Sequence, residues 1–284
     1  MEERGCFRNC LVWLRLTNEH PTLFTKSQFT GLNPYIFTVY RFVVTLYLTA
    51  FACWYTAASA PEYGWTYLVY LTNLTLLLVV FYLIASSINS TIVLIRRCRH
   101  TTEEVVSSSS SGTIDGNNAL PFIYKIQWFL YNMATASSLL VVLIYWGAIY
   151  TPDTDVTIFT DLNIHGLTIL VMAIETLVSA VPVRMSHGIY PLAYGVFYVI
   201  LTVIFWAAGG TDPNGNAYIY SIIDYEENAD FAVIVVIGAL IGIIVCHVVM
   251  WLLFKLRMKV VTKWFEDDTR DEETEGEQVA TSGV

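Results

Sequence analysis

Six long apolar stretches, each separated from the next by a polar segment, dominate this sequence. Each is long enough to cross the hydrocarbon core of a bilayer as an α-helix, which needs roughly 20 residues. Because 55% of the 284 residues are hydrophobic and only 14% are charged, an ordinary soluble domain is excluded. The sequence therefore predicts an all-α, polytopic membrane protein, a bundle of six transmembrane helices. The predicted spans are residues 35–58, 65–95, 122–150, 163–183, 190–208 and 231–254.

The charged residues predict the orientation of the bundle. Six spans place both termini on one side, and all of the 15 Lys and Arg residues except Arg41 fall in or beside the segments on that side. Cytoplasmic loops carry an excess of Lys and Arg, so both termini are predicted to be cytosolic. The charged residues of the opposite side are all acidic: Glu62, Asp153, Asp155, Asp161, Asp212, Asp224, Glu226, Glu227 and Asp230.

This topology divides the chain into segments. We expect a cytosolic N-terminal segment at residues 1–34 and a six-span membrane domain at 35–258, with a cytosolic Ser-rich loop at 96–121 inside it. Residues 259–284 form an acidic tail, and composition predicts disorder for both the tail and the loop. No cleavable signal peptide is expected, so the first span should direct insertion. The membrane is either the plasma membrane or the endoplasmic reticulum.

Polar side chains inside the apolar stretches are candidates for function, because ionisable groups are costly in lipid. His165 lies near the outer mouth of the fourth span, and Glu175 lies ten residues deeper, near the midplane. Thr72 lies roughly 10 Å below the outer end of the second span, so it can face His165 at a similar depth. Arg41 lies about two helical turns into the first span, where it can snorkel to the surface.

Each of these groups also has a structural interpretation. A Thr in a membrane helix usually bonds its own preceding carbonyl, and a His at a helix mouth is often an interfacial hydrogen-bonder. For Glu175, pairing with a Tyr, Asn or His is slightly favoured over catalysis, because a carboxylate at the midplane needs a partner. His247 is interpreted as structural or interfacial. We find no metal-ligand cluster, nucleotide fingerprint or nucleophile elbow, so neither a metal nor a cofactor is expected.

Several motifs resemble the rolling stone protein family. They are HPTLFTKSQF and YIFTVYRF near the start, YLTN in the second span, and the long stretch NIHGLTILVMAIETLVSAVPVRMSHGIYPLAYG that continues through the fifth span. The resemblance covers roughly Cys6 to Lys259. Rolling stone proteins are related to the androgen-induced and androgen-dependent membrane proteins, which include hydrolases of fatty acid esters of hydroxy fatty acids. The resemblance implies a catalytic pair of one intramembrane Thr and one intramembrane His.

The family pattern places its His ten residues before a Glu, and His165 and Glu175 keep that spacing. The family Thr follows an aromatic residue and a Leu, as Thr72 does here. The family pattern also has a Trp, which lies closer to its Thr than Trp65 lies to Thr72. The resemblance therefore implies Thr72 as nucleophile and His165 as base, with Thr66, one turn away, left open. Asn73, Asn163 and Glu175 are candidates for contacting the substrate or oxyanion, or for lining the polar interior.

Three functions are compatible with this sequence. The leading hypothesis is a membrane-embedded hydrolase of lipid esters, with membrane lipids around it and a lipid ester as substrate. The alternative, which the resemblance also implies, is a non-enzymatic protein of cell–cell fusion or adhesion, whose acidic loop at residues 209–230 contacts a cell-surface partner or a second copy. A third is a transporter that uses Glu175 as its ion site, although no inverted repeat supports it. No nucleic acid partner is expected.

Overall fold

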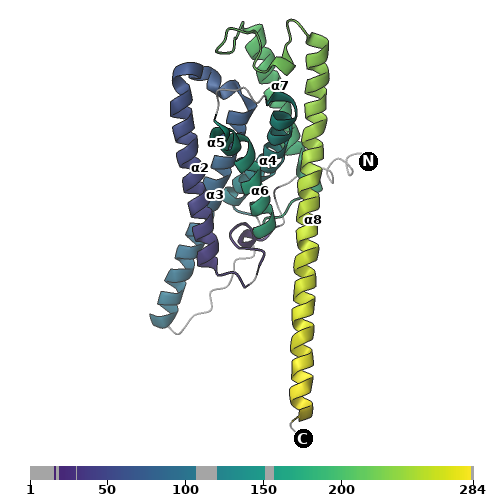
Figure 1. Ribbon diagram of the computed structural model, residues 1–284. Helices are drawn as coiled ribbons and strands as arrows, with labels where there is room; N and C mark the ends of the chain where they lie inside the picture. The colour runs from purple at the N-terminus through teal and green to yellow at the C-terminus, as the bar shows by residue number, and fades with distance from the viewer. Residues whose placement is uncertain (1–15, 17–18, 30, 107–119, 151–156, 283–284) are drawn as a thin grey trace, which may run out of the picture.

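The prediction of an all-α bundle with six spans is confirmed. The computed structural model describes residues 16, 19–29, 31–106, 120–150 and 157–282, with the side chains of 100–106 and 264–282 excepted. Within these residues six helical segments are long and apolar enough to cross a membrane (Figure 1). Their main helices are α2 (Pro34–Tyr63), α3 (Leu71–Val106), α4 (Phe122–Ile144), α6 (Leu167–Val178), α7 (Ile189–Ala207) and α8 (Ala229–Ser282).

Shorter helical turns extend or join these helices. The 3₁₀ turns are η1 (Pro21–Phe24), η2 (Gly64–Val69), η5 (Met185–Gly188) and η6 (Ser221–Ile223). Two π-helical turns, η3 (Tyr145–Ile149) and η4 (Leu162–Gly166), continue α4 and precede α6, and the single turn α5 (Ile158–Asp161) lies directly before η4.

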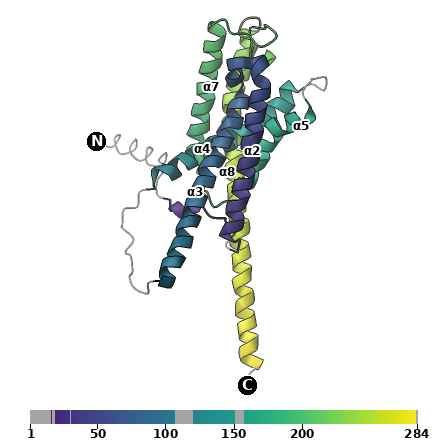
Figure 2. The ribbon, with the colours of Figure 1, turned by 90° about the vertical axis from the view of Figure 1, so that its left-hand side faces the viewer.

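The spans alternate in direction, so the bundle has two distinct ends (Figures 1 and 2). We call the end where α2 begins and α3 finishes the basic end, because the described Lys and Arg side chains lie in that half. The acidic end carries the turn between α2 and α3 and the loop at 208–228 between α7 and α8. Large apolar side chains remain exposed along the outer faces of the helices, as a lipid environment requires.

Helix α4 packs against α3, α6, α7 and α8, and α3 packs in turn against α2. The break between α2 and α3 has a local cause. Gly64 adopts a positive φ of 51° after α2, and Tyr70 is extended before α3 begins. At the start of α2, Asn33 caps the helix by accepting a hydrogen bond from the backbone N–H of Tyr35, and Pro34 occupies the first helical position.

The segment at residues 20–29 closes the basic end of the bundle. Phe24 is fully buried, and its ring contacts those of Tyr124 and Trp128. Further along, Ser27 pairs with Ser179 as an isolated antiparallel bridge, and the backbone N–H of Ala180 donates to the Lys26 carbonyl at 3.1 Å. The segment is therefore part of the packed structure, although the sequence placed it with the cytosolic N-terminal residues.

Two element boundaries differ from the sequence prediction. Helix α3 extends to Val106, into the predicted loop, whose Ser-rich residues 107–119 lie outside the described residues. Helix α8 continues to Ser282, through the segment predicted to be a disordered tail. That segment contains no proline and is rich in Glu, which has a good helix propensity, so the backbone can continue the helix.

We predict that Phe24→Ala lowers the free energy of unfolding by about 3–5 kcal/mol, the usual cost of removing a fully buried Phe side chain. Phe29→Ala, on the same segment, is the control, because Phe29 is exposed and its removal leaves no internal cavity. Denaturant unfolding of the purified protein in detergent measures both. Equal stability of the two variants would show that residues 20–29 do not close the bundle.

Candidate active site

His165 lies in a buried aromatic and acidic environment near the acidic end. Its ring stacks on Tyr145, with 3.3 Å between ring centroids and 3° between ring planes. The carboxylate of Asp161 lies one helical turn away, 3.8 Å from Nδ1, and accepts a hydrogen bond of 2.6 Å from the Tyr145 hydroxyl. Asp161 and His165 are both buried. The three side chains form one packed cluster.

Both rings of this stack are carried by π-helical turns. Tyr145 begins η3 at the end of α4, and His165 lies in η4 before α6. A π-helical turn is rare and occurs frequently at functional sites, because it displaces side chains from the regular helical positions. Here the two turns bring a Tyr and a His face to face.

The hydrogen bonds determine which nitrogen of His165 carries the proton. Nδ1 lies 3.2 Å from the backbone carbonyl oxygen of Asp161, which can only accept, so Nδ1 is the donor. In the neutral ring the other nitrogen, Nε2, then keeps its lone pair. Within the described part of the chain Nε2 makes no hydrogen bond. A His oriented in this way is arranged to act as a base.

Thr72 lies in the first turn of α3 and lines a narrow cavity of about 60 Å³. Tyr145, Tyr198, Thr202 and Tyr220 line the same cavity. Burial raises the pKa of Tyr220, which lies in the loop outside the spans, and a hydrogen bond with Thr72 acts in the opposite direction. Tyr145 is common to both groups: it stacks on His165 and borders the cavity of Thr72. No hydrogen bond joins Thr72 directly to His165 among the described residues.

Two other candidates for the site, Thr66 and Asn73, form hydrogen bonds with nearby backbone carbonyls. The Thr66 hydroxyl donates to the carbonyl of Tyr63, in the turn before α3. Asn73 uses one N–H of its amide to bond the Tyr67 carbonyl at 2.9 Å, which holds that same turn against α3.

Asn163 accepts a hydrogen bond of 2.6 Å from the Tyr47 hydroxyl and donates to the Phe159 carbonyl. It joins η4 to α2 and so fixes the turn that carries His165. Asn73 and Asn163 therefore position the elements around the site through contacts within the protein.

Glu175 is buried away from this cluster and forms an ion pair with Arg41. Arg41 Nη2 lies 2.9 Å and Nε 3.4 Å from the two carboxylate oxygens, and the Tyr82 hydroxyl donates to Glu175 at 2.7 Å. The expectation that Arg41 snorkels to the surface is wrong: its side chain is fully buried. A buried charge is stable only when it is paired, and the carboxylate on α6 supplies the partner.

Asp161 and Tyr145 are the members of the cluster that sequence reasoning missed. The sequence predicts Asp161 in an outer loop, but α5 begins at Ile158 and includes Asp161. The signal was present: Asp161 and His165 are four residues apart, which places both on one face of a helix. No comparable signal marks Tyr145, because its contact with His165 depends on tertiary packing.

Comparison with known proteins shows the family of this chain. A model of the family described as "Protein rolling stone" matches residues 14–266. The chain belongs to the rolling stone family. It is 32% identical over 135 residues to the protein rolling stone of Drosophila melanogaster, an alignment that covers 47% of this chain and 49% of that relative. The alignment thus spans about half the length of the relative. No solved structure matches the chain.

We predict that Arg41→Met lowers the free energy of unfolding by about 3–5 kcal/mol, because it leaves the Glu175 carboxylate buried without its charge partner. The double variant Arg41→Met with Glu175→Leu should recover most of this loss, since neither charge then remains. Arg96→Met, at an exposed position of α3, is the control and should change stability little. Unfolding in detergent measures all of these variants. If the free energy of unfolding lost by the double variant equalled the sum of the losses of Arg41→Met and Glu175→Leu alone, the side chains would not be energetically coupled.

Proposed function

We propose that this rolling stone family protein hydrolyses lipid esters within the membrane, with His165 as the base. The observation that carries the proposal is the orientation of His165: Asp161 holds Nδ1, and Nε2 is left to accept a proton. A nucleophile, a base and a third group that orients the base form the usual arrangement for acyl transfer. Fatty acid esters of hydroxy fatty acids are the substrate class that the resemblance implies.

In the proposed reaction the Thr72 hydroxyl attacks the ester carbonyl, and His165 Nε2 accepts its proton and passes it to the leaving alcohol. A water molecule, deprotonated by the same nitrogen, then attacks the acyl group on Thr72 and releases the fatty acid, and the proton returns to the Thr72 oxygen. Tyr145 borders both groups, so it must rotate away from the imidazole for the substrate carbonyl to reach them. The second N–H of the Asn73 amide is a candidate donor for the oxyanion. The apolar walls of the cavity, formed by α4, α7 and α8, suit an acyl chain.

We predict that Thr72→Ala and His165→Ala, made separately, each abolish ester hydrolysis and labelling by a fluorophosphonate probe. Thr66→Ala is the matched control and should retain activity, because the Thr66 hydroxyl bonds a local carbonyl. Asp161→Asn should lower kcat by about 10²–10⁴-fold with a smaller change in KM, as expected when a base loses the group that orients it. Hydrolysis of a series of long-chain esters by the purified protein measures these effects, and full activity in both alanine variants would rule out the mechanism.

A second candidate function, contact between cells, is supported by the acidic loop between α7 and α8. The loop has a built structure: Asp212 accepts hydrogen bonds from the backbone N–H groups of Asn214 and Asn216, and Asp224 accepts from those of Glu226 and Glu227. Glu226 and Glu227 themselves are exposed. An ordered acidic surface suits a basic partner on an apposed cell, provided that both termini are cytosolic and the protein reaches the plasma membrane.

If contact between cells is the function, neutralising the exposed acids of this loop should reduce it several-fold. The variant combines Glu226→Gln and Glu227→Gln in the loop with Asp230→Asn in the adjoining first turn of α8, and leaves the loop-forming Asp212 and Asp224 intact. Glu62→Gln is the control, because Glu62 is exposed at the same end but belongs to α2. Aggregation of cells that express each variant at equal surface levels is the measurement. Thr72→Ala and His165→Ala would leave aggregation unchanged here, which distinguishes this function from hydrolysis.

A further inference from the structure

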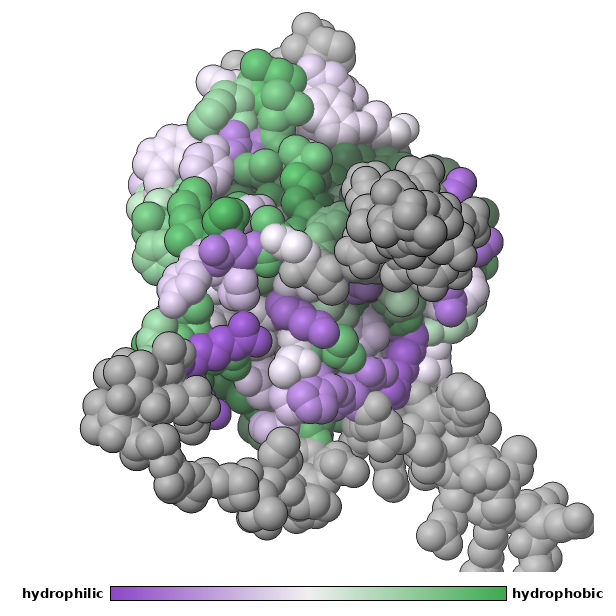
Figure 3. Space-filling model, turned by 90° about the horizontal axis from the view of Figure 1, so that it is seen from below, coloured by the Kyte–Doolittle hydropathy of each residue, from purple (hydrophilic) through white to green (hydrophobic). Residues whose placement is uncertain are grey.

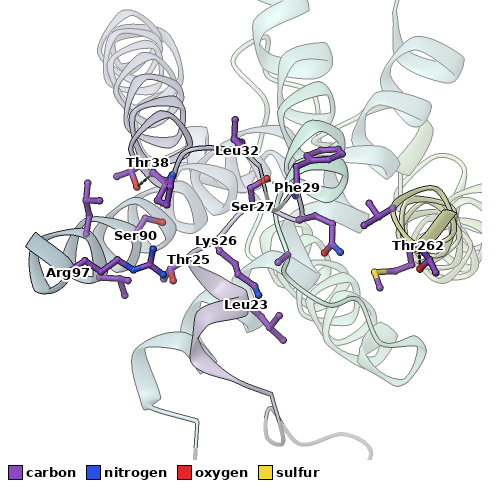
Figure 4. A pocket seen from close by; sticks show the side chains of 17 residues that line it. Leu23, Thr25, Lys26, Ser27, Phe29, Leu32, Thr38, Ser90, Arg97 and Thr262 are labelled. Atoms are coloured by element: carbon purple, nitrogen blue, oxygen red, sulfur yellow. Dashed lines mark hydrogen bonds between the residues drawn. The ribbon is translucent and has the colours of Figure 1, made fainter. Parts of the chain in front are cut away.

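A large cavity lies at the basic end of the bundle, away from His165 and Thr72. Its volume is about 720 Å³, within the usual range for small-molecule sites. Residues 23–29 and Leu32 form one wall, and the others come from the start of α2, the second half of α3 and the middle of α8 (Figure 4). The segment that closes the bundle therefore also shapes this cavity.

The position of the cavity relative to the spans points to the headgroup layer. Its lining includes Pro34, at which the first candidate span begins, and Arg97 and Thr262, which follow the apolar stretches 65–95 and 231–254. A cavity beyond the apolar stretches of these helices lies where the hydrocarbon core gives way to lipid headgroups. Viewed from this end, the molecule presents hydrophilic side chains next to apolar ones (Figure 3).

The charge of the cavity is positive, although the whole chain has a formal net charge of -9. Lys26 and Arg97 line it, and Figure 4 shows the Arg97 side chain extending from α3 toward Thr25. Within the described part of the chain no acidic side chain lines it. A guanidinium has five N–H donors in a planar fork, so Arg97 can contact a phosphate while it also bonds a protein group.

Apolar side chains make up about half of the lining, and part of the wall is held by a hydrogen bond. Val93 and Leu94 on α3 and Val261 on α8 line the same cavity, and they offer a surface for the first carbons of acyl chains. Ser90, also in the lining, accepts a hydrogen bond of 2.9 Å from the buried Arg41, whose guanidinium also donates to the Phe24 carbonyl. The cavity wall is thus fixed to the ion pair in the centre of the bundle.

We propose that this cavity binds an anionic phospholipid from the leaflet at the basic end. The lipid phosphate lies between Lys26 and Arg97, and its acyl chains leave along Leu94 and Val261. Charge-assisted hydrogen bonds from these cations recognise the phosphate, and the absence of acidic lining favours a headgroup with net negative charge. A zwitterionic headgroup binds less well, because its ammonium group is repelled by the same cations.

Binding of a chain-labelled fluorescent phosphatidic acid to the purified full-length protein in neutral detergent tests this proposal. Unlabelled phosphatidic acid should displace the probe, and phosphatidylcholine with the same chains should do so at least tenfold less well. Two further competitors test whether the site recognises another anion: glycerol 3-phosphate is a soluble phosphate, and oleate is a lipid carboxylate. Equal competition by glycerol 3-phosphate would show a soluble phosphate site, and equal competition by oleate would show a carboxylate site; either result overturns the proposal.

Two neighbouring arginines on α3 provide a matched pair of variants. Arg97→Gln should weaken binding roughly tenfold, the effect of losing a charge-assisted contact, whereas Arg96→Gln should change it less than about twofold, since Arg96 is exposed outside the cavity. Lys26→Gln should likewise weaken binding, and Lys259→Gln is its control, because Lys259 is exposed outside the cavity. Equal weakening within each pair would indicate nonspecific attraction to the basic end, which contradicts a specific site.

Leu94→Trp tests the cavity without changing any charge. The larger side chain fills the space that the acyl chains need, so phosphatidic acid binding should be lost. Retained binding by a Leu94→Trp variant that elutes as a monodisperse peak would place the lipid elsewhere. If Arg97→Gln fails to fold, Leu94→Trp still tests whether the cavity binds the lipid.

A peptide of the acidic C-terminal residues tests the chain's own tail as the occupant. If this peptide competes as well as phosphatidic acid does, the cavity binds the tail, and the proposal is overturned.

Discussion

The buried ion pair between Arg41 and Glu175 is the interaction on which the arrangement of the bundle depends. Each charge alone in an apolar interior would cost several kcal/mol, so the two helices that carry them must meet at this point. Nη1 of Arg41 is used as well, because it donates to the Phe24 carbonyl and to Ser90 on α3. One guanidinium therefore joins α2, α3, α6 and the segment at residues 20–29. Hydrophobic burial alone could not specify this arrangement, because lipid solvates an apolar helix face as well as another helix does.

This pair also separates the two ends of the molecule. Toward the basic end the polar contacts lead to fixed structure: Gln127 donates to the Phe24 carbonyl and accepts from Asn89, and Arg257 bonds the carbonyl oxygens of Thr176 and Ser179. Toward the acidic end the cluster around His165 combines an aromatic hydroxyl, one carboxylate and one imidazole, and two π-helical turns carry its Tyr and its His. The two ends of the bundle therefore differ in the kind of polar group that each brings together.

The sequence predicts the spans well, because a span is recorded directly in consecutive apolar residues. It also locates His165 and Glu175 in depth, since depth follows from residue number along a helix. The rotation of each helix about its axis and the pairing between helices cannot be derived from residue number or from consecutive apolar residues. Arg41 and Glu175 are 134 residues apart, and only the packed bundle shows that they meet. For the same reason the stacking of Tyr145 on His165 could not be predicted, whereas Asp161 could have been found from its spacing to His165.

The two intramembrane ionisable groups that the sequence singles out therefore differ in chemical capacity. Glu175 has both oxygens engaged, by a guanidinium and by the Tyr82 hydroxyl, so any proton that it accepted would break the pair that organises the bundle. His165 has one nitrogen fixed to the backbone and, within the described residues, the other left without a hydrogen bond. Proton transfer at His165 disturbs only Tyr145 and Asp161, which lie beside it. The proposed chemistry therefore belongs at the imidazole, and the carboxylate on α6 is a structural group that helps to hold the bundle together.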